Sequence, residues 1–211
     1  MHVAHPIRGV IPSLDGPVIE VLAGTTRTLT GREVHRLAGV GSVRGVRLVL
    51  ARLVAQGLVI AEERGGAILY VGNRDHLAWS ALESLAHVRS MLLDRIAADV
   101  AAWPIAPAHV SLFGSAARGD GDAASDIDLL IVHPERVGTL DRWDEQVDRL
   151  REGVHAWTGN RCQAVDIGRT RLWEHVRARD PIVAAWLADG LLVFGEPLEQ
   201  LVGPPLGPEN G

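Results

Sequence analysis

Residues 111–132, SLFGSAARGDGDAASDIDLLIV, join two short apolar runs through a polar stretch rich in glycine, serine and aspartate. The second run begins with Asp126 and Asp128, two residues apart. Side chains alternate between the faces of a β-strand, so both carboxylates are expected on one face and Ile127 and Leu129 on the other. Crowded carboxylates repel each other, and a divalent cation with its preference for oxygen ligands removes that penalty. The pattern therefore predicts a buried strand that starts at a metal site.

The first apolar run, AHVSLF, predicts a strand that ends at Gly114 and Ser115 and leads into a brief helical segment. Glycine allows a backbone to approach a ligand closely, and the start of a helix offers free N–H groups to an anion. Ser115 adds a hydroxyl group, and Arg118 is a further candidate for a phosphate contact, with an ion-pair or packing role as an equal alternative. A phosphate-binding turn that faces a carboxylate pair is what metal-assisted phosphoryl chemistry needs.

A third carboxylate is expected from the next strand. The segment TLDRWDEQVDRLREGVHAWTG has the apolar spacing of a helix of about five turns. The following run, CQAVDIG, reads as a short strand that carries Asp166. A strand, a crossover helix and a strand place the second strand beside the first, so Asp166 is expected to join Asp126 and Asp128.

The stretch LFGSAARGDGDAASDIDLLIV resembles the signature of the polymerase-β-like nucleotidyltransferases, and most closely that of their minimal bacterial branch. The signature is Gly-Ser, a spacer of about ten residues and Asp-x-Asp, and the resemblance extends over about residues 80–200. It implies a small mixed sheet flanked by helices, and transfer of a nucleoside monophosphate from a nucleoside triphosphate with the help of two Mg²⁺ ions. It also implies roles for five residues: triphosphate binding by Gly114 and Ser115, and metal binding by Asp126, Asp128 and Asp166.

The first 73 residues predict a helix, a second helix, a short turn, a third helix and a hairpin. Thr30 and Glu33 have the spacing of a capping box, and Ser42 is the expected cap of the third helix. The stretch LTGREVHRLAGVGSVRGVRLVLARLVAQGLV resembles the winged-helix regulators of bacteria. The resemblance implies that the helix from Ser42 enters the major groove of double-stranded DNA.

Three arginines are candidate DNA contacts together with Ser42. Arg44 and Arg47 lie off the apolar stripe of the third helix, where they can reach phosphates or guanine edges. Arg64 lies at the tip of the hairpin, a position from which an arginine can enter a minor groove. The alternative is that these arginines are only solvated charges, and that the module docks on a protein.

Charge and cysteine content indicate how many modules the chain has and in which compartment it is expected. Residues 1–73 contain eight arginines against five acidic residues, and residues 74–211 contain 13 against 21, so that the net charges are +3 and −8. This asymmetry favours two modules with different partners. The lone cysteine, Cys162, excludes an intrachain disulfide and fits a reducing cytoplasm. No apolar run approaches the ~20 residues of a membrane helix, so we expect a cytoplasmic protein without a membrane partner.

The expected fold class is α+β, in four segments. These are a winged helix-turn-helix domain (1–73), a long connecting helix or two helices in series (74–103), a nucleotidyltransferase domain (104–202) and a disordered tail (203–211). The segment from Asp75 to Trp103 contains no Pro or Gly. Most of its apolar residues are expected to pack in a core, and its first half is a candidate seam for a homodimer.

The leading hypothesis is a DNA-binding nucleotidyltransferase that regulates transcription and transfers a nucleotide from ATP or another nucleoside triphosphate. The acceptor is a protein, an RNA or a small molecule. The fused DNA-binding module favours an autoregulated antitoxin that modifies a partner toxin. The alternative is a non-catalytic regulator whose second module senses a nucleotide.

Overall fold

The computed structural model describes residues 1–3, 5–122, 124–134 and 140–203. Its internal contacts divide the chain into two compact units, one that ends at Arg89 and one that begins at Ser90 and also includes Met1 and Val3. The division falls inside the segment predicted as a connecting helix. Within the described ranges, no helix has the length and apolar character needed to cross a bilayer. Apart from Gly203, the predicted tail lies outside the described residues.

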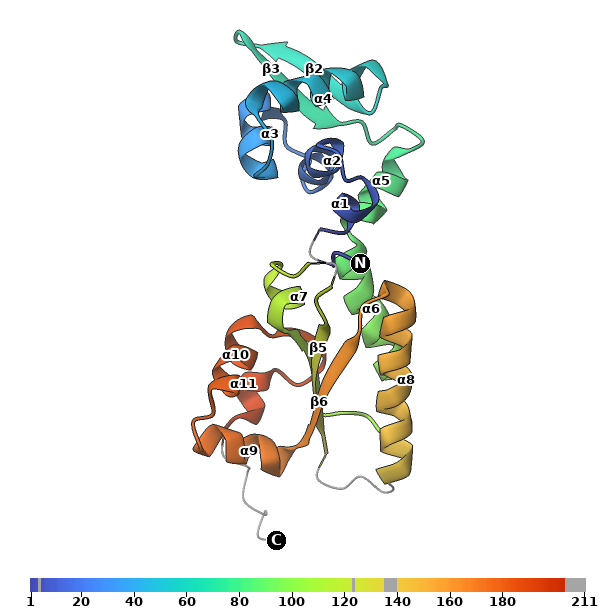
Figure 1. Ribbon diagram of the computed structural model, residues 1–211, viewed down its shortest axis with the longest axis vertical. Helices are drawn as coiled ribbons and strands as arrows, with labels where there is room; N and C mark the ends of the chain where they lie inside the picture. The colour runs from blue at the N-terminus through green and yellow to red at the C-terminus, as the bar shows by residue number, and fades with distance from the viewer. Residues whose placement is uncertain (4, 123, 135–139, 204–211) are drawn as a thin grey trace. The chain divides into compact units, whose positions relative to one another are not determined.

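The first unit is a helical region with a small antiparallel sheet (Figure 1). Its strands lie in the order β1-β3-β2. In chain order its elements are α1 (Pro6–Val10), α2 (Asp15–Ala23), β1 (Leu29–Thr30), α3 (Gly31–Ala38), α4 (Val43–Ala55), β2 (Val59–Arg64), β3 (Ala67–Gly72) and α5 (Trp79–Ala86). The short strand β1, which pairs with Leu69 and Tyr70 of β3, was not predicted from the sequence.

The helix starts of this unit follow from their capping residues. The Thr30 hydroxyl accepts a hydrogen bond from the backbone N–H of Glu33, and the Glu33 carboxylate accepts one from the backbone N–H of Thr30. This is the predicted capping box, which satisfies free donors at the start of α3. Ser42 caps α4 by accepting from the N–H of Gly45 at 3.1 Å.

Of the two arrangements expected for residues 74–103, one long helix or two helices in series, the structure has the second: α5 and α6 (Val88–Ala101) are separated at His87. His87 has φ −103° and ψ 12°, outside the helical range. The Glu83 carbonyl lies 3.1 Å from the backbone N of His87 and 2.7 Å from its Nδ1, so the side chain competes for the helical acceptor. Trp79 of α5 packs in the core of the first unit, and Ile96 of α6 in a core of the second.

The second unit is built on a mixed four-stranded sheet in the order β6-β5-β4-β7. Strands β5 and β6 are parallel, whereas β4 pairs antiparallel with both β5 and β7. Its elements after α6 are β4 (His109–Phe113), α7 (Gly114–Arg118), β5 (Ile127–His133), α8 (Leu140–Thr158), β6 (Cys162–Gly168), α9 (Arg169–Arg177), α10 (Pro181–Asp189), β7 (Leu191–Gly195) and α11 (Leu198–Leu201).

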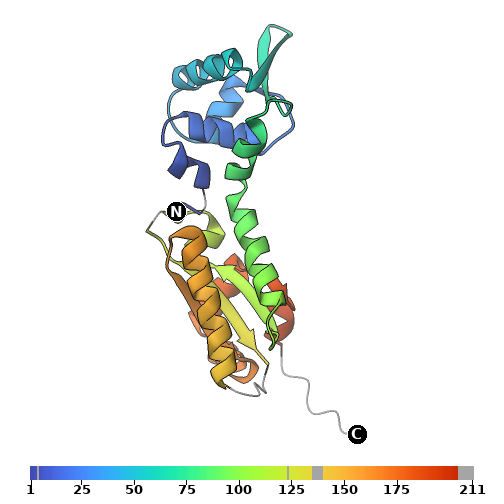
Figure 2. The same ribbon diagram turned by 90° about the vertical axis from the view of Figure 1, so that its right-hand side faces the viewer.

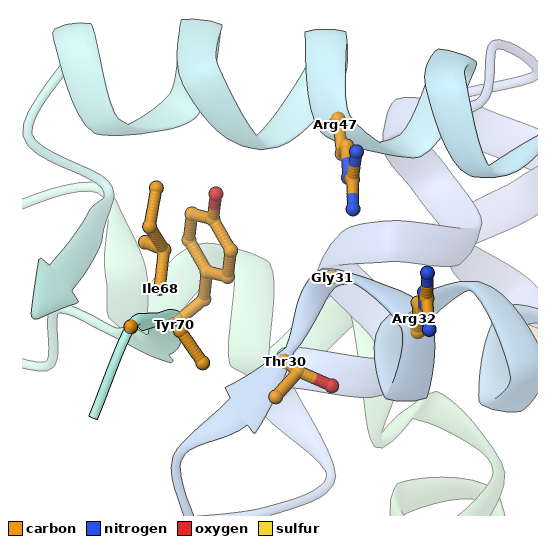
Figure 3. A pocket seen from close by; sticks show the side chains of 8 residues that line it. Thr30, Gly31, Arg32, Arg47, Ile68 and Tyr70 are labelled. Carbon is orange, nitrogen blue, oxygen red and sulfur yellow. The ribbon is translucent and has the colours of Figure 1, made fainter. Parts of the chain in front are cut away.

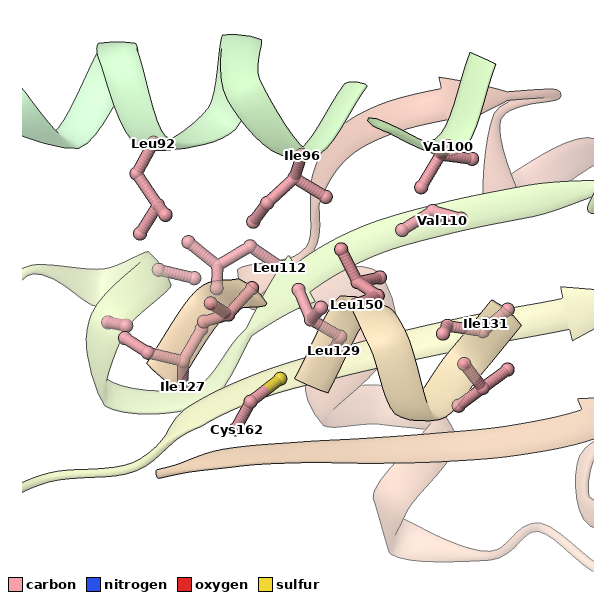
Figure 4. Close-up of a cluster of buried hydrophobic side chains, with 14 of the residues drawn as sticks. Leu92, Ile96, Val100, Val110, Leu112, Ile127, Leu129, Ile131, Leu150 and Cys162 are labelled. Atoms are coloured by element: carbon pink, nitrogen blue, oxygen red, sulfur yellow. The ribbon is translucent and has the colours of Figure 1, made fainter. Parts of the chain in front are cut away.

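Helices cover both faces of this sheet (Figures 1 and 2). On one face α6 and α8 pack against Ile127, Leu129 and Ile131 of β5, as Figure 4 shows for part of this cluster. On the other face α9, α10 and α11 pack against Leu130 and Val132. The alternation along β5 therefore buries both sides of the strand, and its polar residues, Asp128 and His133, lie toward its two ends.

The close contact between Gly72 and Trp79 in the first unit predicts that a larger residue at position 72 is destabilising. A Cβ atom on Gly72 would lie 2.1 Å from ring atoms of the buried Trp79. We expect Gly72→Ala to lower the free energy of unfolding by about 1–3 kcal/mol, because overpacking forces the ring or the strand to shift. Gly9→Ala is the matched control, since a Cβ there meets no atom within 4 Å. Urea unfolding followed by circular dichroism measures both, and equal stability of the two variants would contradict the packing.

Candidate functional site

Asp126 and Asp128 lie at the start of β5, the central strand that pairs with both β4 and β6. Asp128 is opposite Phe113, the last residue of β4, and Asp126 directly precedes β5. Asp128 belongs to the face of β5 that carries Leu130 and Val132, as the alternation of side chains requires. Both aspartates are half-buried.

Gly114 lies directly beside the carboxylate of Asp128. It directly follows β4 and has φ +70°, in the left-handed region that favours glycine. A Cβ atom on it would lie 2.5 Å from Oδ2 of Asp128. Position 114 therefore requires glycine for two reasons. Its backbone conformation favours glycine, and a Cβ atom there would collide with the carboxylate of Asp128.

The electrostatics of the pair suit a bound cation. Burial, and then the negative charge of Asp126, raise the pKa of Asp128 above its usual value, while Arg118 acts in the opposite direction. A carboxylate that is partly desolvated and repelled by a neighbour is stabilised by a divalent cation, because such ions prefer charged oxygen ligands. Two carboxylates beside a cradle that a Cβ would fill fit one Mg²⁺ ion, which usually takes one or two carboxylates together with substrate phosphates.

Gln163 of β6 is the third polar residue at this position, and sequence reasoning did not single it out. The parallel pairing of β5 with β6 places Gln163 in register with Asp128. Its neighbours Val165 and Ile167 pack on the same side of the sheet as Leu130, so Gln163 and Asp128 share a face. The Nε2 amide of Gln163 donates a hydrogen bond to Oδ2 of Asp126. Only the register of the two strands could have revealed this residue.

Asp166 does not join the carboxylate pair, contrary to the expectation from strand order. It is in register with Ile131, three residues beyond Asp128, or about 10 Å along the strand. It also lies on the opposite face, because Cys162 and Ala164 of the same strand pack with the α6–α8 cluster. Strand order alone brought β6 beside β5, but it fixed neither the register nor the face.

Asp166 contacts α8 rather than the carboxylate pair. Nε1 of Trp143, in α8, donates to its Oδ2 at 2.7 Å, and its Oδ1 is buried with no hydrogen-bond partner among the described residues. Burial raises the pKa of Asp166, and the Trp143 hydrogen bond only partly opposes the shift. In the described part of the chain, no group of three or more His, Cys, Asp or Glu residues is arranged to hold a metal ion.

Ser115 and Arg118 lie in the short helix α7. The Ser115 carbonyl accepts from the backbone N–H of Gly119 at 2.9 Å and of Gly121 at 3.2 Å, so the following loop folds back over the helix. Arg118 is exposed and makes ion pairs with Asp120 at 3.1 Å and with Asp189 of α10 at 2.7 Å. A phosphate contact by Arg118 therefore requires it to leave one of these acids.

In the first unit, Arg47 lines a groove of about 730 Å³ (Figure 3). Figure 3 shows Arg47 of α4 pointing toward the start of α3, where Arg32 lies, with Tyr70 and Ile68 of β3 beside it. We call this hollow the arginine groove; its lining is Thr30, Gly31, Arg32, Arg47, Gly66, Ala67, Ile68 and Tyr70. Arg32 was not among the residues predicted from the sequence.

The other predicted DNA contacts, Ser42, Arg44 and Arg64, do not line the arginine groove. Arg44 and Ser42 are exposed at the start of α4. Arg64 ends β2 and forms an ion pair with Glu62 at 2.7 Å. The register pairs Arg64 with Ala67 and Ala61 with Tyr70, so Arg64 is on the opposite face of the hairpin from Tyr70.

Comparison with known protein families finds a match that includes the carboxylate pair. Residues 93–180 match the nucleotidyltransferase domain family. Over these residues the chain is similar to nucleotidyltransferase domains, which indicates a transferase enzyme. No protein of curated function matches the sequence significantly.

Three solved structures of different proteins are each similar to part of this chain. A candidate nucleotidyltransferase from Sulfolobus solfataricus is 25% identical, with 56% of this chain and 88% of that chain covered and a TM-score of 0.33. A toxin-antitoxin complex with AMP-PNP is 16% identical, with 53% and 79% covered and a TM-score of 0.34. Human N-acetylserotonin methyltransferase with SAM is 22% identical, with 45% and 32% covered and a TM-score of 0.28.

The assignment of Asp166 to the α8 interface predicts a specific pH dependence. Because its folded-state pKa is raised, the parent loses stability as the pH rises from about 4 through that raised pKa. Asp166→Asn cannot ionise, so its free energy of unfolding relative to the parent should increase between about pH 4 and about pH 7. Urea unfolding at several pH values measures the difference. A relative loss of stability over the same range would mean that Asp166 is ionised and stabilising in the folded protein.

Proposed function

We propose that the second unit transfers a nucleoside monophosphate from a nucleoside triphosphate to an acceptor, with Asp126 and Asp128 as its metal-binding carboxylates. The observation that carries this proposal is the approach of Gly114 to the carboxylate of Asp128, within a domain that matches nucleotidyltransferases. Asp166 is not part of this proposed site. The two carboxylates supply ligands for one Mg²⁺ ion, and among the described residues no third His, Cys, Asp or Glu joins them to hold the second ion expected from the family.

The chain's own residues have separable roles in this proposal. Gly114 leaves space for the carboxylate of Asp128, and its backbone and the hydroxyl of Ser115 are candidate contacts to a phosphate. Arg118 offsets charge near Asp128 and is available to the triphosphate once Asp120 or Asp189 is released. When bound, Mg²⁺ would neutralise triphosphate charge and make the α-phosphorus more electrophilic. An oxygen or nitrogen of the acceptor then forms a bond to that phosphorus, and pyrophosphate leaves.

The position of Asp166, away from Asp126 and Asp128, favours a second candidate function. A site with two carboxylates rather than three is also what a domain that binds a nucleotide without reacting would retain. In that case the protein is a regulator whose second unit senses a nucleoside triphosphate. Turnover separates the two candidates, since both predict nucleotide binding and only the first predicts release of pyrophosphate.

The first unit supports a DNA-binding role. Its element order α2-β1-α3-α4-β2-β3, with the sheet order β1-β3-β2, is the arrangement we expect of a winged helix-turn-helix, with α4 as the recognition helix. The exposed Arg44 and the groove residues Arg32 and Arg47 give this unit a basic surface. Arg64, which is paired with Glu62, is a weaker candidate.

A DNA-binding unit in the same chain as a transferase suggests autoregulation. We place a partner toxin first among the acceptors, ahead of an RNA or a small molecule, so that this protein would be the antitoxin. This ranking rests on the combination of units and not on any acceptor pocket. The protein would then repress its own gene through the first unit and inactivate the toxin through the second.

The catalytic proposal predicts the effect of one isosteric change. Asp128→Asn removes a metal ligand while retaining its shape, so we expect transfer from α-labelled nucleoside triphosphates with Mg²⁺ to fall at least about a hundredfold. Asp94→Asn, at an exposed acid on α6 of the same unit, is the control and should retain parental turnover. If the parent binds the nucleotide but never releases pyrophosphate with any acceptor, the sensor function is correct instead.

The DNA-binding proposal predicts a change in salt dependence. Replacing Arg44 and Arg47 by alanine should weaken binding to a mixed-sequence duplex and lower the slope of log K against log salt by about 1–2, because fewer counterions are released. Fluorescence anisotropy at several salt concentrations measures the slope. Arg142→Ala, at an exposed position on α8, is the control for a change in net charge. Unchanged affinity in the double variant would assign the first unit to protein docking.

A further inference from the structure

We infer that Gln163 is a positioning residue of the Asp126–Asp128 site, which it completes with a neutral side chain where a third carboxylate is expected. The inference rests on the proposed function and deepens it. Because Gln163 is neutral, the side chains of Asp126, Asp128 and Gln163 together carry a charge of −2. A divalent cation therefore binds weakly alone and tightly together with a nucleoside triphosphate.

Strand pairing puts Gln163 at the site. Parallel strands place residues in register side by side on one face, and Gln163 is the residue of β6 in register with Asp128. Gln163 is exposed, so its side chain is accessible to solvent where it meets Asp126. Asp166, the acid expected at this place, is further along the strand and on the other face.

The hydrogen bond from Gln163 to Asp126 defines what the residue does. Asp126 lies outside β5 and has no ladder partner of its own to fix its orientation. The amide N–H of Gln163 donates to Oδ2 of Asp126 and so holds this carboxylate beside Asp128. A hydrogen bond to a charged acceptor is stronger than one between neutral groups, and it reduces the repulsion between the two acids.

The neutral side chain has a consequence for cation binding. Affinity for a divalent cation increases with the number of charged ligands, and a third carboxylate would also add repulsion when no cation is bound. With Gln163 the chain avoids that repulsion, and the missing negative charge is supplied by the substrate's phosphates. The site therefore couples the cation to the nucleotide more strongly than a three-carboxylate site would.

Three variants of the full chain test this role through metal binding rather than activity. The probe is Mn²⁺, titrated alone and with ATP, with bound metal measured by electron paramagnetic resonance and stability by the melting temperature. Gln163→Glu should bind Mn²⁺ alone roughly tenfold more tightly than the parent and melt at a lower temperature without metal. Gln163→Ala should bind Mn²⁺ with ATP several-fold more weakly, because Asp126 is no longer held. Asp166→Asn should match the parent in Mn²⁺ binding.

The outcomes separate this inference from the proposed function. Asp128→Asn measures the site itself, and it should abolish Mn²⁺ binding with ATP. If it does so while both Gln163 variants bind like the parent, the role of Gln163 is overturned and the proposed metal site stands. If Asp128→Asn leaves Mn²⁺ binding intact, the metal site is elsewhere and both proposals fail. A loss of Mn²⁺ binding in Asp166→Asn would restore Asp166 as a ligand and contradict the inference.

Discussion

The register between β5 and its two neighbours is the constraint on which the candidate site depends. Pairing with β4 puts Asp128 opposite Phe113 and so brings Gly114 against its carboxylate. Pairing with β6 puts Gln163 beside Asp128 and moves Asp166 away. Both faces of β5 are buried, so a slip by one residue would turn Asp128 into the α6–α8 core and expose Leu129 in its place. The apolar core therefore holds the polar residues in position.

The parts of the site that lie close together in the sequence could be predicted from it. The alternation of Asp126 and Asp128, the need for glycine at position 114 and the capping box of Thr30 with Glu33 all depend on residues within one element or at its end. Asp166 could not be placed in this way, because strand order does not define register. The break at His87 depends on a side-chain hydrogen bond to Glu83 that apolar spacing does not report.

Each unit has a hydrophobic core of its own, and this matters for how variants are interpreted. The core of the first unit includes Trp79, whereas the sheet of the second is covered by separate clusters on its two faces. A substitution in the arginine groove thus lies outside the clusters that pack around β5, and a substitution at the carboxylate pair lies outside the core to which α4 belongs. Loss of one function with retention of the other can then be attributed to the site and not to general unfolding.

The most direct test of this account is the position of a bound metal. Crystals grown with Mn²⁺ and a non-hydrolysable nucleoside triphosphate analogue would show it by anomalous scattering. We predict a peak at about 2.0–2.3 Å from carboxylate oxygens of both Asp126 and Asp128, with Gln163 beside it and no peak within ligand distance of Asp166. A peak bound to Asp166, or a nucleotide complex with no metal at Asp126 and Asp128, would contradict the account.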